Sequence, residues 1–190
     1  FDPRNVCDAT HLKHEPSIIE RWNEDWDARS LLSKIKIPVC YLSATNDFFG
    51  CHEIAEEHLL ELAEDVPVRR SSHPNLDHHA GLQHGKLANS WMNAYLLKGQ
   101  QLPAEPKLDT ELNVIADESE PIERIEIWWT SNKVPDAFRC WWPGKPQSDG
   151  CVSAFGRVFY TNGIVLNTPT RLIQSDSGDL QPLPATWPDA

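Results

Sequence analysis

An aspartate and a histidine, each following a short segment of strand-forming residues, are the side chains of this sequence best suited to chemistry. Asp47 follows residues 37–42, and His78 follows residues 68–72. A carboxylate that accepts the Nδ1–H of an imidazole fixes the tautomer of the ring and stabilises the imidazolium. The second ring nitrogen, Nε2, can then take a proton from a serine hydroxyl. The two residue types therefore predict an acid–base pair that would serve a nucleophile.

Two predicted strands and the helix between them would bring this pair together. Residues 37–42 are mostly apolar and favour a strand buried on both faces. Residues 68–72 predict a second strand, and residues 52–65 predict a helix between the two. A strand–helix–strand unit is a right-handed crossover that joins parallel strands. Since the loops after both strands then leave the same edge of the sheet, we expect Asp47 and His78 to meet there.

The predicted helix over residues 52–65 has an apolar side and an acidic side. Ala55, Leu59 and Leu62 recur at the helical period of about 3.6 residues and should face the protein. A second helix is predicted over residues 82–97. We expect the acidic side of the first helix to lie in solvent, where it would present Glu53, Glu56, Glu57, Glu61 and Glu64.

The second half of the chain has a different pattern. Residues 100–112 combine prolines with charged residues and predict a linker. Residues 125–129 alternate with the period of a half-buried strand. Asn162-Gly163 lies between two apolar segments, which is a strong hairpin signal because both turn positions have to adopt positive φ. We therefore expect an α/β unit over residues 1–99 and a small all-β, sandwich-like unit over residues 113–190.

The composition narrows the classes of partner. The formal net charge of −11 argues against nucleic acid, because binding to a phosphate backbone depends on basic patches. No apolar run approaches the roughly 20 residues that cross a bilayer. The 5 cysteines lack a Cys-x-x-Cys spacing, and at least one must be unpaired. Cys140 and Cys151 could form a disulfide or remain two buried thiols, so cysteine usage leaves the compartment open.

Two segments around the acid–base pair resemble known motifs. Residues 38–47 are similar to the penultimate-strand motif of α/β-hydrolases, and Asn75-Leu76-Asp77-His78-His79 resembles the histidine loop of that family. The order along the chain also matches, since the family places its nucleophile first, then the acid, then the histidine. The combination most resembles bacterial dienelactone-hydrolase-like and acetyl-xylan-esterase-like serine esterases. Some of these carry an Ig-like β domain after the last helix.

The resemblance implies a fold and a reaction. The fold would be α/β, the C-terminal portion of an α/β-hydrolase domain over residues 1–99, followed by a small Ig-like β domain. Asp47 would orient His78, which would act as general base and then as general acid in ester hydrolysis through an acyl-enzyme. His79 remains open as the neighbouring alternative. The implied substrate is a small-molecule or carbohydrate ester, with an amide left open as the alternative. We expect no cofactor, no metal and no membrane to be involved, and a secreted or periplasmic location is favoured.

The sequence departs from the family at the nucleophile. No Gly-x-Ser-x-Gly motif occurs in it, and nothing before Asp47 resembles a strand–turn–helix that presents a serine. The chain begins at Phe1 without a methionine or a signal-peptide pattern, which predicts a mature or truncated chain. We therefore expect the nucleophile and the oxyanion hole in the N-terminal half of the hydrolase domain of a longer parent chain. We expect no turnover without them.

Other residues near the pair could line a substrate pocket or bind a metal. Phe48 and Phe49 follow Asp47 and could line a substrate pocket, or they could simply pack beside the turn. The histidines around the second strand could instead bind a metal, but their spacing does not place two ligands on one helix face. These histidines are His73, His78, His79 and His84.

The tryptophans of the second half support a rival function of another class. The alternation of residue types places Trp129 and Trp142 on apolar faces, so we expect both in the core. Trp128 and Trp141 would then be exposed and could stack on a carbohydrate ring. The rival function is a non-catalytic binding or interaction protein, with the hydrolase-like part as scaffold and the β domain in contact with a partner.

Overall fold

The computed structural model describes residues 20–21, 24, 29–47, 52–78, 84–131, 139–146, 152–173 and 180–181. The first half contains α3 (Arg29–Leu32), β1 (Val39–Ala44), α4 (His52–His58), the 3₁₀ turn η2 (Leu59–Glu61), β2 (Val68–His73) and α5 (Gly85–Leu96). The second half contains β3 (Lys107–Leu108), β4 (Val114–Ile115), β5 (Ile122–Thr130), β6 (Trp142–Pro143), β7 (Ser153–Tyr160), β8 (Val165–Asn167), β9 (Arg171–Ile173) and β10 (Leu180–Gln181). Within the described ranges, every helix is too short or too polar to span a membrane.

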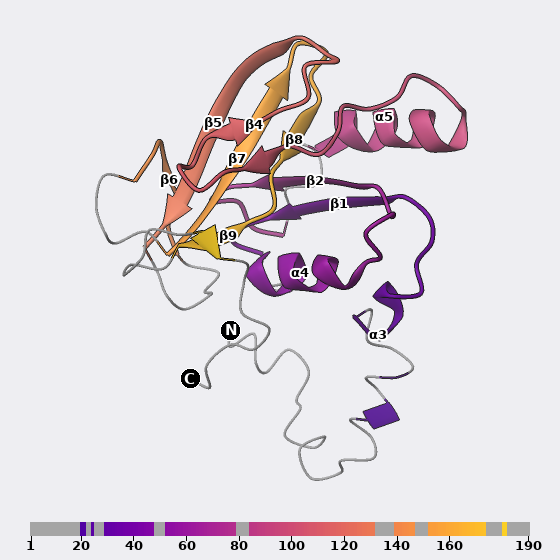
Figure 1. Cartoon of the computed structure of the whole chain (residues 1–190), viewed down its shortest axis with the longest axis horizontal. Coiled ribbons are helices and arrows are strands. Elements are labelled where there is room, and N and C mark those ends of the chain that lie inside the picture. Colours follow the sequence, from indigo (N-terminus) through magenta and orange to yellow (C-terminus); the bar gives the residue numbers. More distant parts are fainter. Residues whose placement is uncertain are drawn as a thin grey trace.

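Strands β1 and β2 pair in parallel, from Val39 opposite Val68 to Ala44 opposite His73. The predicted parallel pairing is therefore confirmed, although β1 lies two residues later in the chain than expected. The N–H of Val39 continues the pairing by donating to the carbonyl of Pro67 (2.9 Å). Figure 1 shows α4 on one face of this strand pair, and α5 with β5, β7 and β8 on the other. The loops that follow both strands leave from the same edge.

Both predicted helices are present but shorter than expected. α4 ends at His58, η2 continues the chain for three residues, and Leu62 is then extended with ψ of 146°. The chain turns here because Leu59, Leu62 and Val66 have to pack as one core cluster under the strand pair. The later helix, α5, begins at Gly85. Residues 82–83 of its predicted range lie outside the described residues.

The second half forms an antiparallel sheet in the order β10-β9-β7-β5-β6, with β8 also paired to β7. The predicted hairpin at Asn162-Gly163 is confirmed, since it joins β7 to β8. Its turn differs from expectation, because Gly163 has a φ of 83° while Asn162 has no positive φ. The Asn162 side chain instead accepts a hydrogen bond from the N–H of Ile164 (3.0 Å). One glycine is therefore sufficient for this turn.

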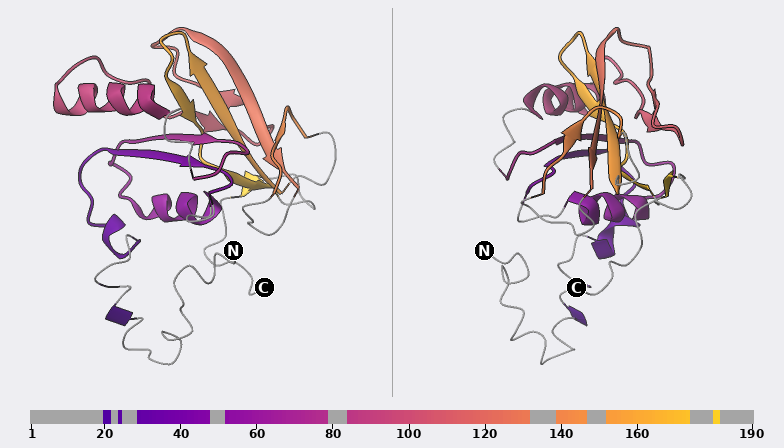
Figure 2. Two further views of the ribbon diagram at one scale, coloured as in Figure 1. Left: turned by 180° about the vertical axis from the view of Figure 1, so that it is seen from behind. Right: turned by 90° about the vertical axis from the view of Figure 1, so that its left-hand side faces the viewer.

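The two halves of the chain share a hydrophobic core. Leu87 of α5 packs with Val158, Tyr160, Ile164 and Leu166 of the β7–β8 hairpin. Both views in Figure 2 place the long strands β5 and β7 across the β1–β2 pair, mostly on the side opposite α4, while β9 reaches the level of α4. The predicted linker over residues 100–112 is packed as well, and two of its prolines, Pro103 and Pro106, are fully buried. The division into two domains stays a prediction, but the halves do not lie apart.

The acidic side of α4 corrects a prediction. Glu53, Glu56 and Glu57 are 0%, 3% and 7% exposed, so the expected solvated face is buried. The reason is that Arg139 of the second half pairs with Glu53, and Arg70 of β2 pairs with Glu56. A buried carboxylate is tolerated when a cation and hydrogen bonds compensate its lost hydration. Only Glu61 and Glu64 of the predicted face lie in solvent.

The burial predicted for Trp141 and Trp142 is wrong for both residues. Trp141 is 1% exposed and Trp142 is 52% exposed. The alternation fails because β6 begins only at Trp142, and Trp141 lies in the preceding irregular segment. Trp128 and Trp129 are both half-buried, and the Trp128 indole N–H donates to Glu126 (2.9 Å). Trp141 is thus a core residue rather than a candidate for carbohydrate binding.

The two cysteines that the structure describes are both free thiols. Cys140 is an exposed free thiol, so neither the disulfide nor the buried thiol expected for it is present. Cys151 lies outside the described residues. Cys40 is a half-buried free thiol, and burial raises its pKa to about 11.

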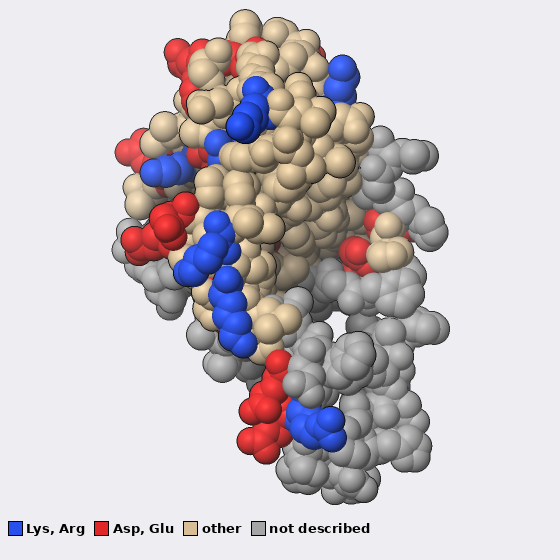
Figure 3. Space-filling view, turned by 90° about the vertical axis from the view of Figure 1, so that its right-hand side faces the viewer, with Lys and Arg blue, Asp and Glu red and all other residues tan. Residues whose placement is uncertain are grey.

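On the face seen in Figure 3, acidic and basic side chains lie next to each other around a broad area without charge.

Gly156 of β7 provides a test of this packing. A Cβ built at Gly156 would overlap Cγ2 of Val114 and crowd Cγ2 of Thr168 (3.1 Å), so a neighbouring side chain or strand would have to shift. We expect Gly156→Ala to lower the free energy of unfolding by about 1–3 kcal/mol, measured by urea denaturation. Adding Val114→Ala should restore part of the loss. Gly85→Ala is the control, because no atom lies within 4 Å of its Cβ, and it should not destabilise.

Candidate functional site

The carboxylate of Asp47 and the imidazole of His78 are in contact. Nδ1 of His78 lies 2.9 Å from Oδ2 of Asp47. The side chain of His78 is 51% exposed and that of Asp47 is 17% exposed, so the pair lies at the protein surface with its acid partly covered. The expected meeting of the two side chains is confirmed. With Nδ1 engaged by the carboxylate, Nε2 is the nitrogen that could exchange a proton with a bound group.

The loops that carry the pair are tied to each other beyond the end of the sheet. The N–H of Thr45 donates to the carbonyl of His73 (2.9 Å), and the N–H of Asn46 donates to the carbonyl of Leu76 (3.0 Å). In the opposite direction, the N–H of Asn75 donates to the Thr45 hydroxyl (2.8 Å). These bonds continue the parallel pairing to Asn46, one residue before Asp47, and to Leu76, two residues before His78. The positions of the two side chains are therefore linked through the main chain.

A third segment, residues 139–141, reaches the site from the second half of the chain. Its main chain is hydrogen-bonded to the side chains of Asn46 and Asn75. Sequence reasoning predicted neither of these contacts. The pair Pro74-Asn75 is a turn signal, and Asn75 indeed adopts a φ of 57°. Nothing in the local pattern reveals contacts with partners 66 and 93 positions away.

Two further histidines lie at the same end of the strand pair. Nε2 of His84 lies 2.9 Å from the carbonyl oxygen of Ser43, and its ring lies 5.0 Å, edge to face, from that of His73. Burial lowers the pKa of His73 to about 4, and the nearby Arg157 contributes in the same direction. Burial also lowers the pKa of His84. Both rings are therefore neutral near pH 7 and act as packing and hydrogen-bonding groups.

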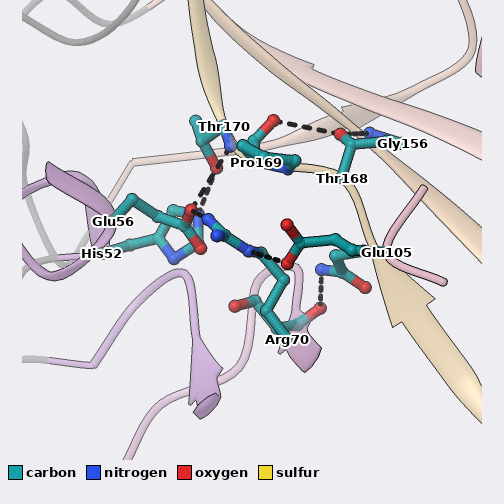
Figure 4. Close-up of polar contacts among 10 residues, drawn as sticks. His52, Glu56, Arg70, Glu105, Gly156, Thr168, Pro169 and Thr170 are labelled. Atoms are coloured by element: carbon teal, nitrogen blue, oxygen red, sulfur yellow. Dashed lines mark hydrogen bonds and ion pairs between the residues drawn. The ribbon is translucent and has the colours of Figure 1, made fainter. Parts of the chain in front are cut away.

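A buried polar network lies on the α4 side of the strand pair. Figure 4 shows the guanidinium of Arg70 between the carboxylates of Glu56 and Glu105. Nε2 of His52 is 2.9 Å from the Thr170 hydroxyl in the same view. Burial raises the pKa of Glu105 even though Arg70 lies beside it. The network joins α4, β2, the 100–112 segment and the chain before β9, while Nδ1 of His52 is buried without a hydrogen-bond partner among the described residues.

Three further residues that the sequence suggests for the site are not among those that the structure describes. Phe48, Phe49 and His79 lie outside the described residues. Two hollows of about 220 Å³ and 280 Å³ lie elsewhere, one beside Lys86 on α5 and one beside Leu60 on η2. Among the described residues, no three His, Cys, Asp or Glu side chains are grouped as a metal site would require.

The contact between Asp47 and His78 makes a prediction about the tautomer of the ring. With the carboxylate as acceptor, the neutral ring should carry its proton on Nδ1. We expect Asp47→Ala to move that proton largely to Nε2, as in free histidine. The ¹⁵N chemical shifts of labelled histidine at pH 8 distinguish the two forms. His58→Ala serves as a control for assignment, and an unchanged His78 spectrum in Asp47→Ala would contradict the contact.

Comparison with known proteins adds no relative. The chain matches no family model, no curated protein and no solved structure. The function is therefore inferred from the residues and their geometry.

Proposed function

We propose that Asp47 and His78 are the acid and the base of a serine ester hydrolase. The observation that supports this proposal is the 2.9 Å contact between Asp47 Oδ2 and His78 Nδ1 at the carboxyl end of two parallel strands. Open α/β sheets present their chemistry at this end. A carboxylate on Nδ1 is the arrangement in which Nε2 acts as a base.

The elements around the pair support a fold assignment within the same proposal. The order strand, acid, helix, strand, histidine and helix corresponds to β1, Asp47, α4, β2, His78 and α5. This is the order of the last elements of an α/β-hydrolase domain, with the antiparallel strands as an Ig-like addition. In this assignment the nucleophile and the oxyanion donors belong to a segment of the natural protein that is not among these residues.

The reaction proceeds in two steps. His78 Nε2 takes the proton of the serine hydroxyl while the serine oxygen attacks the ester carbonyl. Asp47 stabilises the imidazolium that forms. The proton then passes from Nε2 to the leaving alcohol, and an acyl-enzyme remains. Water, activated by the same nitrogen, releases the acid and restores the serine. The proposed substrate class is a carboxylic ester of a small molecule or a carbohydrate.

The test uses the natural full-length protein, including any residues that precede Phe1. We expect a fluorophosphonate probe to label one serine, and His78→Ala to abolish the labelling because the serine is no longer activated. His58→Ala should label normally. The proposal fails if the natural protein contains no reactive serine, or if His78→Ala labels as fast as the wild type. Either result favours the non-catalytic binding protein.

A further inference from the structure

The segment of residues 139–141 belongs to the antiparallel half of the chain but contacts both loops of the candidate site. Nδ2 of Asn46 donates to the carbonyl of Arg139 (2.7 Å). Nδ2 of Asn75 donates to the carbonyl of Trp141 (2.9 Å), and the N–H of Trp141 donates to Oδ1 of Asn75 (2.8 Å). The Asn75 amide thus pairs with the main chain of Trp141 in the way that a neighbouring strand would.

The two asparagines are placed where a displacement would reach the acid and the histidine. Asn46 directly precedes Asp47, and Asn75 is three residues before His78. Asn75 adopts a φ of 57°, a backbone conformation that asparagine tolerates better than most residues. Asn75 is an exposed residue, yet both polar atoms of its side chain are bonded to the main chain of Trp141. These contacts therefore connect residues 139–141 to the site itself.

The segment is held firmly from its other side. The guanidinium of Arg139 forms an ion pair with Glu53 of α4, and the two side chains are 2% and 0% exposed. The same guanidinium lies 4.8 Å from the ring centre of Trp141. The Trp141 ring is 1% exposed and packs edge to face on His52 and Phe155, at 5.8 Å and 5.0 Å. A segment anchored in this way can hold in place the two loops that are hydrogen-bonded to it.

We infer that residues 139–141 act as a brace that positions the Asp47–His78 pair, with Asn46 and Asn75 as positioning residues. The antiparallel half of the chain is then a required part of the site rather than an independent binding module. The effect of the brace on catalysis rests on the function proposed above. The geometric effect on the pair does not depend on it, and it can be measured without a substrate.

The test removes the bonds between the asparagines and the brace. Asn75→Gly deletes both bonds to Trp141, and glycine adopts a φ of 57° without strain. We expect the share of His78 with its proton on Nδ1 to fall at least halfway to the value of Asp47→Ala, read from ¹⁵N shifts in the folded chain. Asn46→Ala deletes the bond to Arg139, together with the bond that Asn46 Oδ1 accepts from the Thr45 hydroxyl (2.7 Å), and should shift the tautomer in the same direction. It replaces Asn75→Gly as the criterion if that variant does not fold.

The matched control is Asn113→Gly. Asn113 also donates through Nδ2 and accepts at Oδ1, in this case with the side chains of Asp109 and Lys145, next to the paired strands β3 and β4. This change should leave the His78 tautomer at its wild-type value. In the full-length protein, Asn75→Gly should lower kcat by about 10- to 100-fold and change KM by less than about 2-fold, because misplacement of a catalytic group acts on the transition state.

The outcomes separate the two proposals. If the His78 tautomer and kcat are unchanged in folded Asn75→Gly and Asn46→Ala, the brace is wrong, whatever the result of serine labelling. If the natural protein contains no reactive serine but both variants shift the tautomer, the brace stands and the hydrolase proposal fails. A tautomer shift of equal size in Asn113→Gly would also overturn the brace, since the effect would then come from general loosening.

Discussion

Replacement of Arg70 by methionine is expected to lower the free energy of unfolding by about 3–5 kcal/mol. Arg70 lies between Glu56 and Glu105, and the side chains of Arg70 and Glu56 are only 4% and 3% exposed. Methionine fills a similar volume but leaves the buried carboxylate of Glu56 and the 24% exposed carboxylate of Glu105 without their cation. Removing one partner of a buried charge network costs more than the network itself contributes, because the other charges remain desolvated. Urea denaturation at pH 7.5 measures the difference.

The loss in Arg70→Met should depend on pH in a definite direction. Burial already raises the pKa of Glu105, and removal of the guanidinium should raise it further. The folded variant then binds a proton that the unfolded chain has released, so its deficit is largest at neutral pH and shrinks as the pH falls toward 5. Glu123→Gln is the control, because the Glu123–Arg124 pair is exposed and should change stability by less than about 1 kcal/mol. A deficit that small in Arg70→Met would contradict the buried network.

His52 should account for a large part of the sensitivity of this protein to acid. The ring is 1% exposed, and burial lowers its pKa to about 3, with Arg139 and Arg70 acting in the same direction. The unfolded chain takes up a proton at this residue near pH 6.5, whereas the folded chain does so only near pH 3. Between these values the unfolded state binds the additional proton, so stability falls as the pH falls. The slope for one proton is about 1.4 kcal/mol per pH unit.

Replacement of His52 by glutamine tests this contribution. Glutamine can still contact the Thr170 hydroxyl, but it does not titrate. We expect the variant to be less stable than the wild type at pH 7, with a flatter pH dependence, so that about 4–5 kcal/mol of the acid-induced loss disappears between pH 6.5 and 3. His73 and His84 should maintain part of the slope, because burial lowers the pKa of both. His58→Gln is the matched control, and equal slopes in His52→Gln and wild type would be the contrary result.

The local fold around the candidate site could be predicted from short stretches of sequence. The apolar segment before Asp47, the helical period after it and the segment before His78 are patterns of fewer than 15 residues each, and together they imply a parallel crossover. The crossover in turn implies that the acid and the histidine meet. The Asn162-Gly163 turn is equally local. In each case the residues that decide the structure are neighbours in the chain.

The parts that the sequence did not predict are decided by partners far away in the chain. Glu53 of α4 looks like part of a solvated face, but Arg139, 86 positions away, pairs with it in the interior. Trp141 looks exposed by alternation, but its main chain is bound to Asn75, 66 positions away, and its ring is drawn into the core. A period of two or of about 3.6 residues records which side of an element is apolar, and it contains no information about which segment will cover the polar side. The sequence alone therefore determined that an acid and a base meet at one edge of a sheet. Only the tertiary structure decided that the antiparallel half holds them there, because that depends on charge pairs and hydrogen bonds between segments that no local pattern connects.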